Sequence, residues 1–238
     1  MKYKSQFASG LAKARKRLKR LDTELLAAIH QASAGNTDGA CEMALQAEDT
    51  SENLTLLLRS LPAYTGSPTA AANALDVMRV NIPVEIGFTE AGWFSLRMPL
   101  LLPKKGGGSA NYIRSFLYPA MQEFFEKAEP VRFTDCVLIY RHVYDAGRPH
   151  RRYRDHDNIE LNMVTDIVAL YVMEDDAPLC CRHYYCSAAG STERTEVYVV
   201  PRTSFGDFLL LENQMPDEGV KLYAQRPVLL EKDVPEAD

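Results

Sequence analysis

The chain has 238 residues, of which 46% are hydrophobic, and its formal net charge is −5. This size and apolar content allow one large domain, or a domain with an extension, around a substantial core. No apolar run approaches the roughly 20 residues that a membrane-spanning helix requires, and no hydrophobic stretch follows the basic N-terminus as in a secretory signal. The five cysteines are odd in number and unevenly spaced, which indicates reduced intracellular thiols. A cytoplasmic protein is therefore expected.

Residues 1–62 predict a helical hairpin. Large aliphatic residues recur close to heptad spacing between residues 2 and 33, namely Leu11, Leu18, Leu21, Leu25 and Ile29. A break at 35–39 follows, where Asp38 can cap a second helix over residues 40–61. Residues 1–20 contain eight Lys/Arg and no acid, whereas the rest of the chain contains 19 basic and 32 acidic residues. The basic run at 13–20 fits a DNA-facing strip, a solvated face paired with acids of the second helix, or a self-association surface.

The middle of the chain begins with a linker and a hairpin. Residues 63–78 contain turn-forming residues and a short helix over 70–78. The apolar runs at 84–88 and 93–102 predict a β-hairpin. The loop Lys104–Ser109, rich in lysine and glycine, then opens a helix over 110–127. It lacks the Lys position of a Walker A loop, and it fits either a mobile loop or a flap that contacts DNA phosphates.

The remaining elements complete an α+β pattern. Strands are predicted at 136–144, 179–186 and 195–200, a short helix at 204–211, and an acidic tail at 216–238. The expected fold class is α+β, with a mixed or antiparallel sheet and packed helices in residues 79–215, preceded by the helical hairpin.

The most informative stretch is residues 155–176. It contains seven acidic residues, namely Asp155, Asp157, Glu160, Asp166, Glu174, Asp175 and Asp176. The apolar segment between its ends predicts a helix, capped by Asp157 or Asn158, with Ile159, Met163, Ile167, Leu170 and Tyr171 along one stripe. Crowded carboxylates raise one another's pKa unless a cation neutralises them, and hard ions such as Mg²⁺ or Mn²⁺ prefer oxygen ligands.

A basic loop runs directly into this acidic segment. Its arginines are Arg148, Arg151, Arg152 and Arg154. The forked donors of a guanidinium group match phosphate oxygens. Acidic residues that hold a metal ion, next to arginines that hold a nucleic-acid backbone, indicate phosphodiester chemistry. The alternative is a solvated charged loop in which the acids cap a helix and form a surface turn.

Cysteine and histidine residues at 180–186 invite comparison with a zinc site. A strand over this segment places Cys181 and His183 on one face and Cys180 and Cys186 on the other. Ligands on opposite faces cannot converge on one ion, and the segment has no CxxC pair. Buried strand cysteines are the favoured interpretation.

The run Asp155-His156-Asp157-Asn158, preceded by arginines and followed by a helix and Glu174-Asp175-Asp176, resembles the motif of the RusA family of phage-type Holliday junction resolvases. The flanking strands at 136–144, 179–186 and 195–200 fit that pattern, and Pro103 to Tyr112 is faintly similar to a loop near the family's start. The resemblance covers about residues 99–201. It implies a small dimeric enzyme that uses Mg²⁺ to cut branched DNA.

The resemblance also assigns roles to residues. It implies that Asp155, Asp157 and Asp176 are catalytic, and that Asp155, Asp157, Asp175 and Asp176 hold Mg²⁺ or Mn²⁺, with Asn158 in support. The arginines at 148, 151, 152 and 154, with Lys104 and Lys105, are the expected DNA contacts. The expected partners are DNA, which the resemblance implies is branched, and a second copy of the chain in a homodimer. No association with a membrane is expected.

One position departs from the RusA pattern. That family usually has a lysine three residues after the motif asparagine, where this chain has Leu161. The leading hypothesis is a metal-dependent, structure-selective DNA endonuclease. Leu161 favours the alternative of a non-catalytic DNA-binding or scaffold protein of a phage or mobile element that keeps the fold. A soluble interaction module, with the acids as helix caps, is the third hypothesis.

Overall fold

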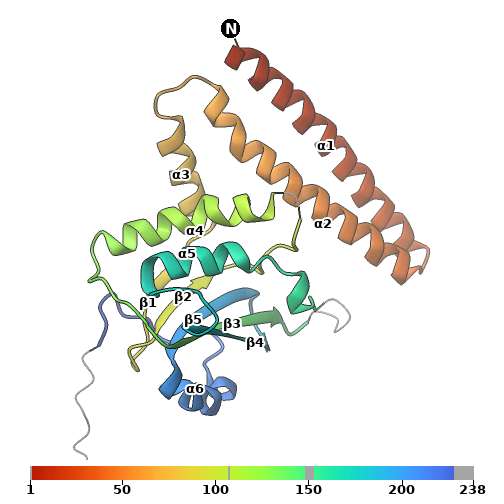
Figure 1. Cartoon of the computed structure of the whole chain (residues 1–238). Helices are drawn as coiled ribbons and strands as arrows, with labels where there is room; N and C mark the ends of the chain where they lie inside the picture. Colours follow the sequence, from red (N-terminus) through yellow and green to blue (C-terminus); the bar gives the residue numbers. More distant parts are fainter. Residues whose placement is uncertain (1, 107, 148–152, 228–238) are drawn as a thin grey trace, which may run out of the picture. The chain divides into compact units, whose positions relative to one another are not determined.

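The computed structural model describes residues 2–106, 108–147 and 153–227. These residues divide into two compact units, one ending at Val77 and the other beginning at Met78. The first contains the helical pair and most of a third helix, and the second contains the sheet (Figure 1). Within the described residues, no helix is both long enough and apolar enough to cross a membrane.

The N-terminal unit is a helical hairpin, as predicted. Its helices are α1 (Lys2–Ser33), α2 (Thr37–Ser60), the short η1 (Leu61–Tyr64) and the start of α3 (Ala70–Asn81). The turn uses Gly35 at φ 74°, and α2 is capped by Asn36, whose side-chain oxygen accepts from the amide of Gly39 at 3.0 Å. The expected cap at Asp38 is therefore wrong by two residues, because the helix begins earlier.

The hairpin interface uses small residues more than the heptad leucines. Ala14 and Ala47 are buried, and a side chain at Gly10 would clash with Leu61. Leu18 and Ile29, by contrast, are 56% and 62% exposed. The heptad pattern thus predicts the helix but not the face that packs in the hairpin. In the basic run, Arg20 pairs with Glu24 at 2.7 Å and Arg17 donates to the Asn53 carbonyl at 2.6 Å.

The second unit is built on a five-stranded mixed sheet, which confirms the predicted α+β class. The strands are β1 (Glu85–Phe88), β2 (Phe94–Met98), β3 (Cys136–Asp145), β4 (Cys181–Gly190) and β5 (Arg194–Pro201). Their order is β1-β2-β5-β3-β4, with β3 and β4 parallel and the other pairs antiparallel. The parallel pair requires a crossover, which α5 (Asn162–Val172) supplies.

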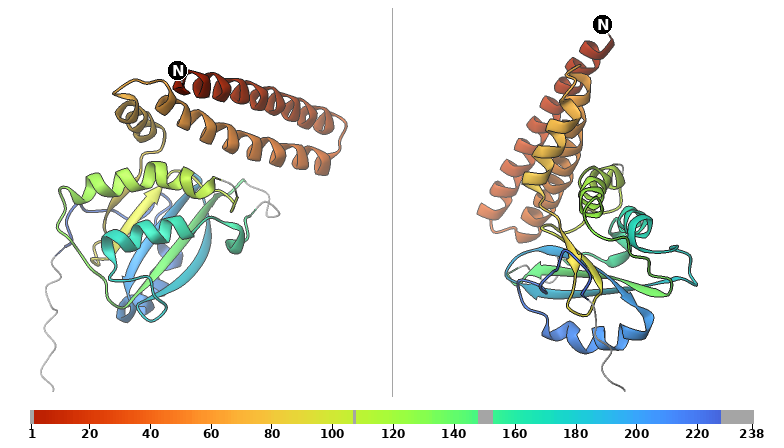
Figure 2. Two further views of the ribbon diagram at one scale, coloured as in Figure 1. Left: turned by 45° about the horizontal axis from the view of Figure 1, so that its top comes forward. Right: turned by 90° about the vertical axis from the view of Figure 1, so that its left-hand side faces the viewer.

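Helices cover both faces of the sheet (Figures 1 and 2). On one face, α4 (Ser109–Phe125) and α5 enclose the main core, which includes Phe116, Leu138 and Val168. On the other, α6 (Phe205–Leu211) covers a smaller core around Trp93 and Phe208, whose ring centroids are 6.0 Å apart.

The helix at the acidic segment begins later than predicted. Residues 156–158 form the short helix η3, and α5 starts only at Asn162. The intervening Ile159 bridges to Lys104 instead of joining the helix. The buried residues of α5 are Val164, Thr165, Ile167, Val168 and Val172, whereas Leu170 is 57% exposed. The predicted stripe is therefore wrong at Leu170, because it was counted from a start in a segment that is not helical.

The cysteines are free thiols in the described residues, and those of the strands are buried. Cys136 and Cys181 face each other across β3 and β4, and Cys186 lies beneath α6 with the smaller core. Residues 216–223, predicted as the start of an acidic tail, instead pack on the sheet, where Tyr223 bridges to Phe88.

Candidate functional site

The acidic motif forms an exposed turn after β3. Asp155 precedes η3 in an extended conformation, and its carbonyl accepts the amide of Asn158 at 3.0 Å. The Asp155, Asp157 and Asn158 side chains are exposed, and Asp155 makes no side-chain cap to the turn. The motif thus presents carboxylates to solvent, whereas the predicted helix cap would have engaged one of them.

The lysine and glycine loop lies directly against this motif. The amide of Lys105 donates to the carbonyl of Asn158 at 2.8 Å, and the amide of Glu160 donates to the carbonyl of Pro103 at 2.9 Å. Together with the bridge between Lys104 and Ile159, these bonds form a short two-stranded pairing. The backbone of Lys104 and Lys105, whose side chains are exposed, is therefore held beside Asn158 and Ile159, directly after Asp157. The sequence named both segments but gave no signal that they pair.

Two further contacts fasten the loop to the acidic segment. The Ser109 hydroxyl, at the start of α4, donates to the Glu160 carboxylate at 2.9 Å. The guanidinium of Arg154 donates to the carbonyl of Leu102, so Arg154 holds the loop in place. The predicted DNA contacts Arg148, Arg151 and Arg152 lie outside the described residues.

The second acidic cluster follows α5. The Asp175 carboxylate accepts the amide of Ala177 at 3.3 Å and stabilises a turn, and Asp176 is exposed. Burial raises the pKa of Asp166, and the charges of Asp176 and Glu160 raise it further. Asp166 therefore lies within electrostatic range of Asp176 and Glu160. Asp166 and Glu160 were counted in the acidic stretch but not assigned to the site.

The predicted metal ligands do not form a metal-holding group in this structure. Among the described residues, which include Asp155, Asp157, Asp175 and Asp176, no three His, Cys, Asp or Glu side chains are placed to hold a metal ion. Their oxygens suit Mg²⁺ in kind, but their arrangement does not supply the required set. Metal binding therefore stays a prediction from the sequence.

A row of imidazole and hydroxyl groups lies beside the motif, and His156 is the one member of it that the sequence motif contains. Nε2 of His156 lies 3.2 Å from the Ser187 hydroxyl, and its ring lies 5.6 Å from that of Tyr185 and 5.5 Å from that of His142. His142 is 1% exposed, and neither ring nitrogen has a hydrogen-bond partner in the described residues. Burial, followed by the nearby His156 and Arg154, lowers the pKa of His142 to about 4.

Leu161 occupies a core position. Its side chain is 6% exposed and belongs to the main core, and its carbonyl accepts the Tyr140 hydroxyl at 3.2 Å. The same tyrosine contacts the Thr165 hydroxyl at 2.8 Å. The side chain at this position therefore points away from the exposed carboxylates.

Comparison with known proteins gives one match. A family model described as a family of unknown function, DUF6100, matches residues 3–225 and so includes the hairpin, the sheet and the acidic motif. No curated protein and no solved structure matches the chain. The chain belongs to the DUF6100 family, a family of unknown function.

Proposed function

We propose that this protein acts on DNA through the surface formed by the acidic motif and the lysine loop, as a metal-dependent, structure-selective endonuclease. The observation that carries the proposal is the backbone pairing that places Lys104 and Lys105 beside Asn158 and Ile159. Lysines neutralise backbone phosphates, and exposed carboxylates accept hard divalent cations. Lys104 and Lys105 would hold the phosphate backbone, and Asp155, Asp157 and Asp176 would hold a cation if one binds there.

The remaining parts of the proposal come from the sequence. Branched DNA as substrate, a homodimer and the metal-binding roles of Asp155, Asp157 and Asp176 follow from the resemblance to RusA-type resolvases, and a cytoplasmic location follows from composition. Since the described carboxylates form no group that holds a metal, the structure supports a binding surface rather than a sequence of chemical steps.

A second candidate function is a non-catalytic DNA-binding protein, which Leu161 favours. A lysine contributes to phosphodiester chemistry only if its ammonium group reaches the phosphate, and position 161 points into the core. A surface that keeps DNA binding but lacks this cation would hold DNA without cutting it.

Binding of a labelled four-way junction, measured over a range of NaCl concentrations, tests the surface. Ca²⁺ in place of Mg²⁺ would neutralise the carboxylates while cutting is suppressed. If both lysines contact phosphates, the plot of the logarithm of the binding constant against the logarithm of the salt concentration becomes less steep in the double variant Lys104→Ala/Lys105→Ala. The magnitude of its negative slope falls by about 1.8. The control Lys127→Ala/Lys221→Ala removes the same charge elsewhere and leaves the slope unchanged. An equal effect of the two double variants would exclude this surface.

A further inference from the structure

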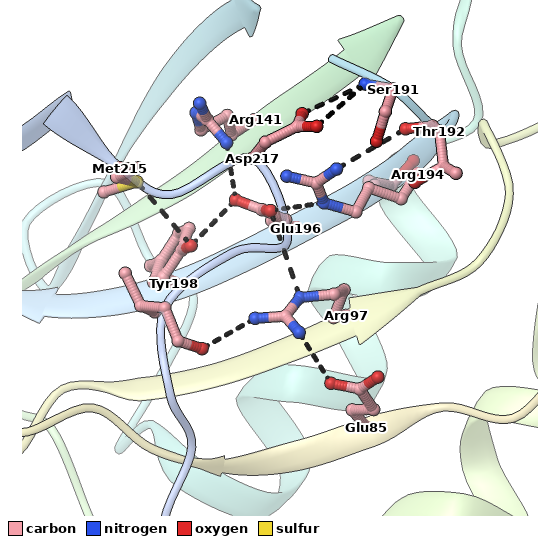
Figure 3. Close-up of polar contacts among 12 residues, drawn as sticks. Glu85, Arg97, Arg141, Ser191, Thr192, Arg194, Glu196, Tyr198, Met215 and Asp217 are labelled. Carbon is pink, nitrogen blue, oxygen red and sulfur yellow. Dashed lines mark hydrogen bonds and ion pairs between the residues drawn. The ribbon is translucent and has the colours of Figure 1, made fainter. Parts of the chain in front are cut away.

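Three arginines from neighbouring strands converge on one carboxylate on the α6 face of the sheet (Figure 3). Glu196 of β5 accepts from Arg194 at 2.6 Å and from Arg141 of β3 at 2.9 Å, and Arg97 of β2 lies 3.9 Å away. The Tyr198 hydroxyl also donates to Glu196 at 2.8 Å. Ile159, which directly follows the acidic motif, packs with the main core on the opposite face.

This cluster contains more positive than negative charge in a buried position. The side chains of Arg141, Arg194 and Glu196 are 7%, 6% and 1% exposed, and that of Arg97 is 14% exposed. Burial alone would raise the pKa of Glu196, but the adjacent Arg141, Arg194 and Tyr198 outweigh it and hold the pKa below its usual value. Glu196 is therefore ionised and balances only one of the three guanidinium charges.

Two solvent-exposed carboxylates, outside the buried cluster, partly compensate the excess positive charge of the arginines. Glu85 bonds Arg97 at 2.7 Å, but its side chain is 61% exposed. Asp217 is exposed and accepts the Ser191 amide with both oxygens, at 3.0 and 3.3 Å. Charges near solvent are screened, so they offset the buried guanidinium groups incompletely.

Buried donors in the cluster lack hydrogen-bond partners. Within the described residues, no acceptor bonds Nη2 of Arg194, and Nε of Arg97 has no hydrogen bond but only the ion pair with Glu196 at 3.9 Å. A buried donor without a partner destabilises the fold, more so on a charged group, and natural structures usually supply a water or an ion at such a place. The unpaired donors thus mark where an acceptor is missing.

Residues 215–223 cover this cluster. The carbonyl of Val220 accepts from Nη2 of Arg97 at 2.7 Å, and the sulfur of Met215 lies 3.8 Å from the Tyr198 hydroxyl. Gly219, at φ 87°, lies so close to the guanidinium of Arg97 that any Cβ would clash with it. The cover therefore follows the shape of the arginines and limits the size of anything that binds beneath it.

We propose that this cluster binds a small oxoanion of the phosphate class, through the unpaired Nη2 of Arg194, beside the charge of Arg97 and beneath residues 215–223. Guanidinium groups present forked donors that match phosphate oxygens, and a second anion would balance the excess buried charge. The site lies across the sheet from the acidic motif, so it stands or falls independently of the proposed DNA surface.

Titration of the full chain with inorganic phosphate, by calorimetry and thermal unfolding, tests the site. NaCl at matched ionic strength is the reference, because phosphate also stabilises proteins weakly by exclusion from their surface. One-site binding with a saturable rise in Tm is expected. A parallel titration with a deoxynucleoside 5′-monophosphate distinguishes a free ion from a phosphate ester.

Arg194→Lys keeps the charge but loses the forked donors, and it should raise the Kd for phosphate at least about tenfold. Arg182→Lys, at the exposed pair with Asp135, is the matched control and should leave the Kd unchanged. The proposal is overturned if the wild type gives no one-site heat up to about 10 mM phosphate, tenfold above a millimolar Kd. It is equally overturned if Tm rises without saturation and to the same extent in Arg194→Lys.

Discussion

Glu196→Gln should be among the most destabilising single substitutions in the sheet unit. The variant removes the one buried negative charge that faces Arg97, Arg141 and Arg194. Removing one partner of a buried ion pair costs about 3–5 kcal/mol, because the remaining charge is left uncompensated. Since domains are stable by about 5–15 kcal/mol, this loss would be a large fraction of the free energy of unfolding.

The single tryptophan makes this measurement specific. Trp93 is buried in the smaller core beside Phe208, so its fluorescence during urea unfolding reports on this face of the sheet. Asp135→Asn, which breaks an exposed pair with Arg182, is the control and should cost no more than about 1 kcal/mol. If Glu196→Gln costs as little as the control at pH 7, the cluster is not electrostatically strained and the charge argument fails.

The pH dependence of the wild type gives an independent check on Glu196. Its pKa in the folded state lies below the usual 4.5, so the unfolded state binds the proton more tightly. The stability from this carboxylate is present above pH 4.5 and is lost as the pH falls through the folded-state pKa. Glu196→Gln should therefore flatten the acid limb of the plot of unfolding free energy against pH.

Three further predictions concern single positions, each measured by urea unfolding followed at Trp93. Leu161→Lys should cost at least about 3 kcal/mol, because it removes buried apolar area and places a charge in the core, and junction cutting should not increase. Gly219→Ala should cost at least about 1 kcal/mol because of its positive φ and its contact with Arg97, whereas Gly206→Ala, open in α6, should be stabilising by about 0.5–1 kcal/mol. The wild type should lose up to about 3 kcal/mol of unfolding free energy as the pH falls from 6.5 to 4, because the His142 imidazole is held neutral in the folded state and takes up a proton on unfolding. His142→Phe should abolish this loss, and an unchanged pH profile would contradict the reasoning.

The order and type of the main elements were predictable because they depend on local periodicity. The hairpin at 84–102, the strand beginning at Cys136 and the short helix after Ser204 all form near the predicted positions. Boundaries were less predictable where distant segments compete for the backbone. Ile159 fits the helical stripe, yet its backbone pairs with Lys104, 55 residues earlier in the chain, and the helix starts at Asn162.

The candidate site was predictable in composition but not in arrangement. Composition identifies acids, arginines and lysines, but only strand register and loop pairing decide which of them meet. The convergence of Arg97, Arg141 and Arg194 on Glu196 depends on three strands far apart in sequence being adjacent in the order β2-β5-β3. The same dependence explains why His142 and His156 gave no signal as a pair.

Cleavage of a labelled four-way DNA junction in Mg²⁺ or Mn²⁺, with wild type beside Asp157→Asn, tests the central claim most directly. Asp157 is exposed in the motif, so the substitution should leave the Trp93 unfolding curve unchanged. The endonuclease proposal predicts metal-dependent cutting that Asp157→Asn abolishes. Tight binding of the junction without cutting would instead establish the non-catalytic alternative. If the protein neither binds nor cuts the junction, that result contradicts a DNA function for this surface.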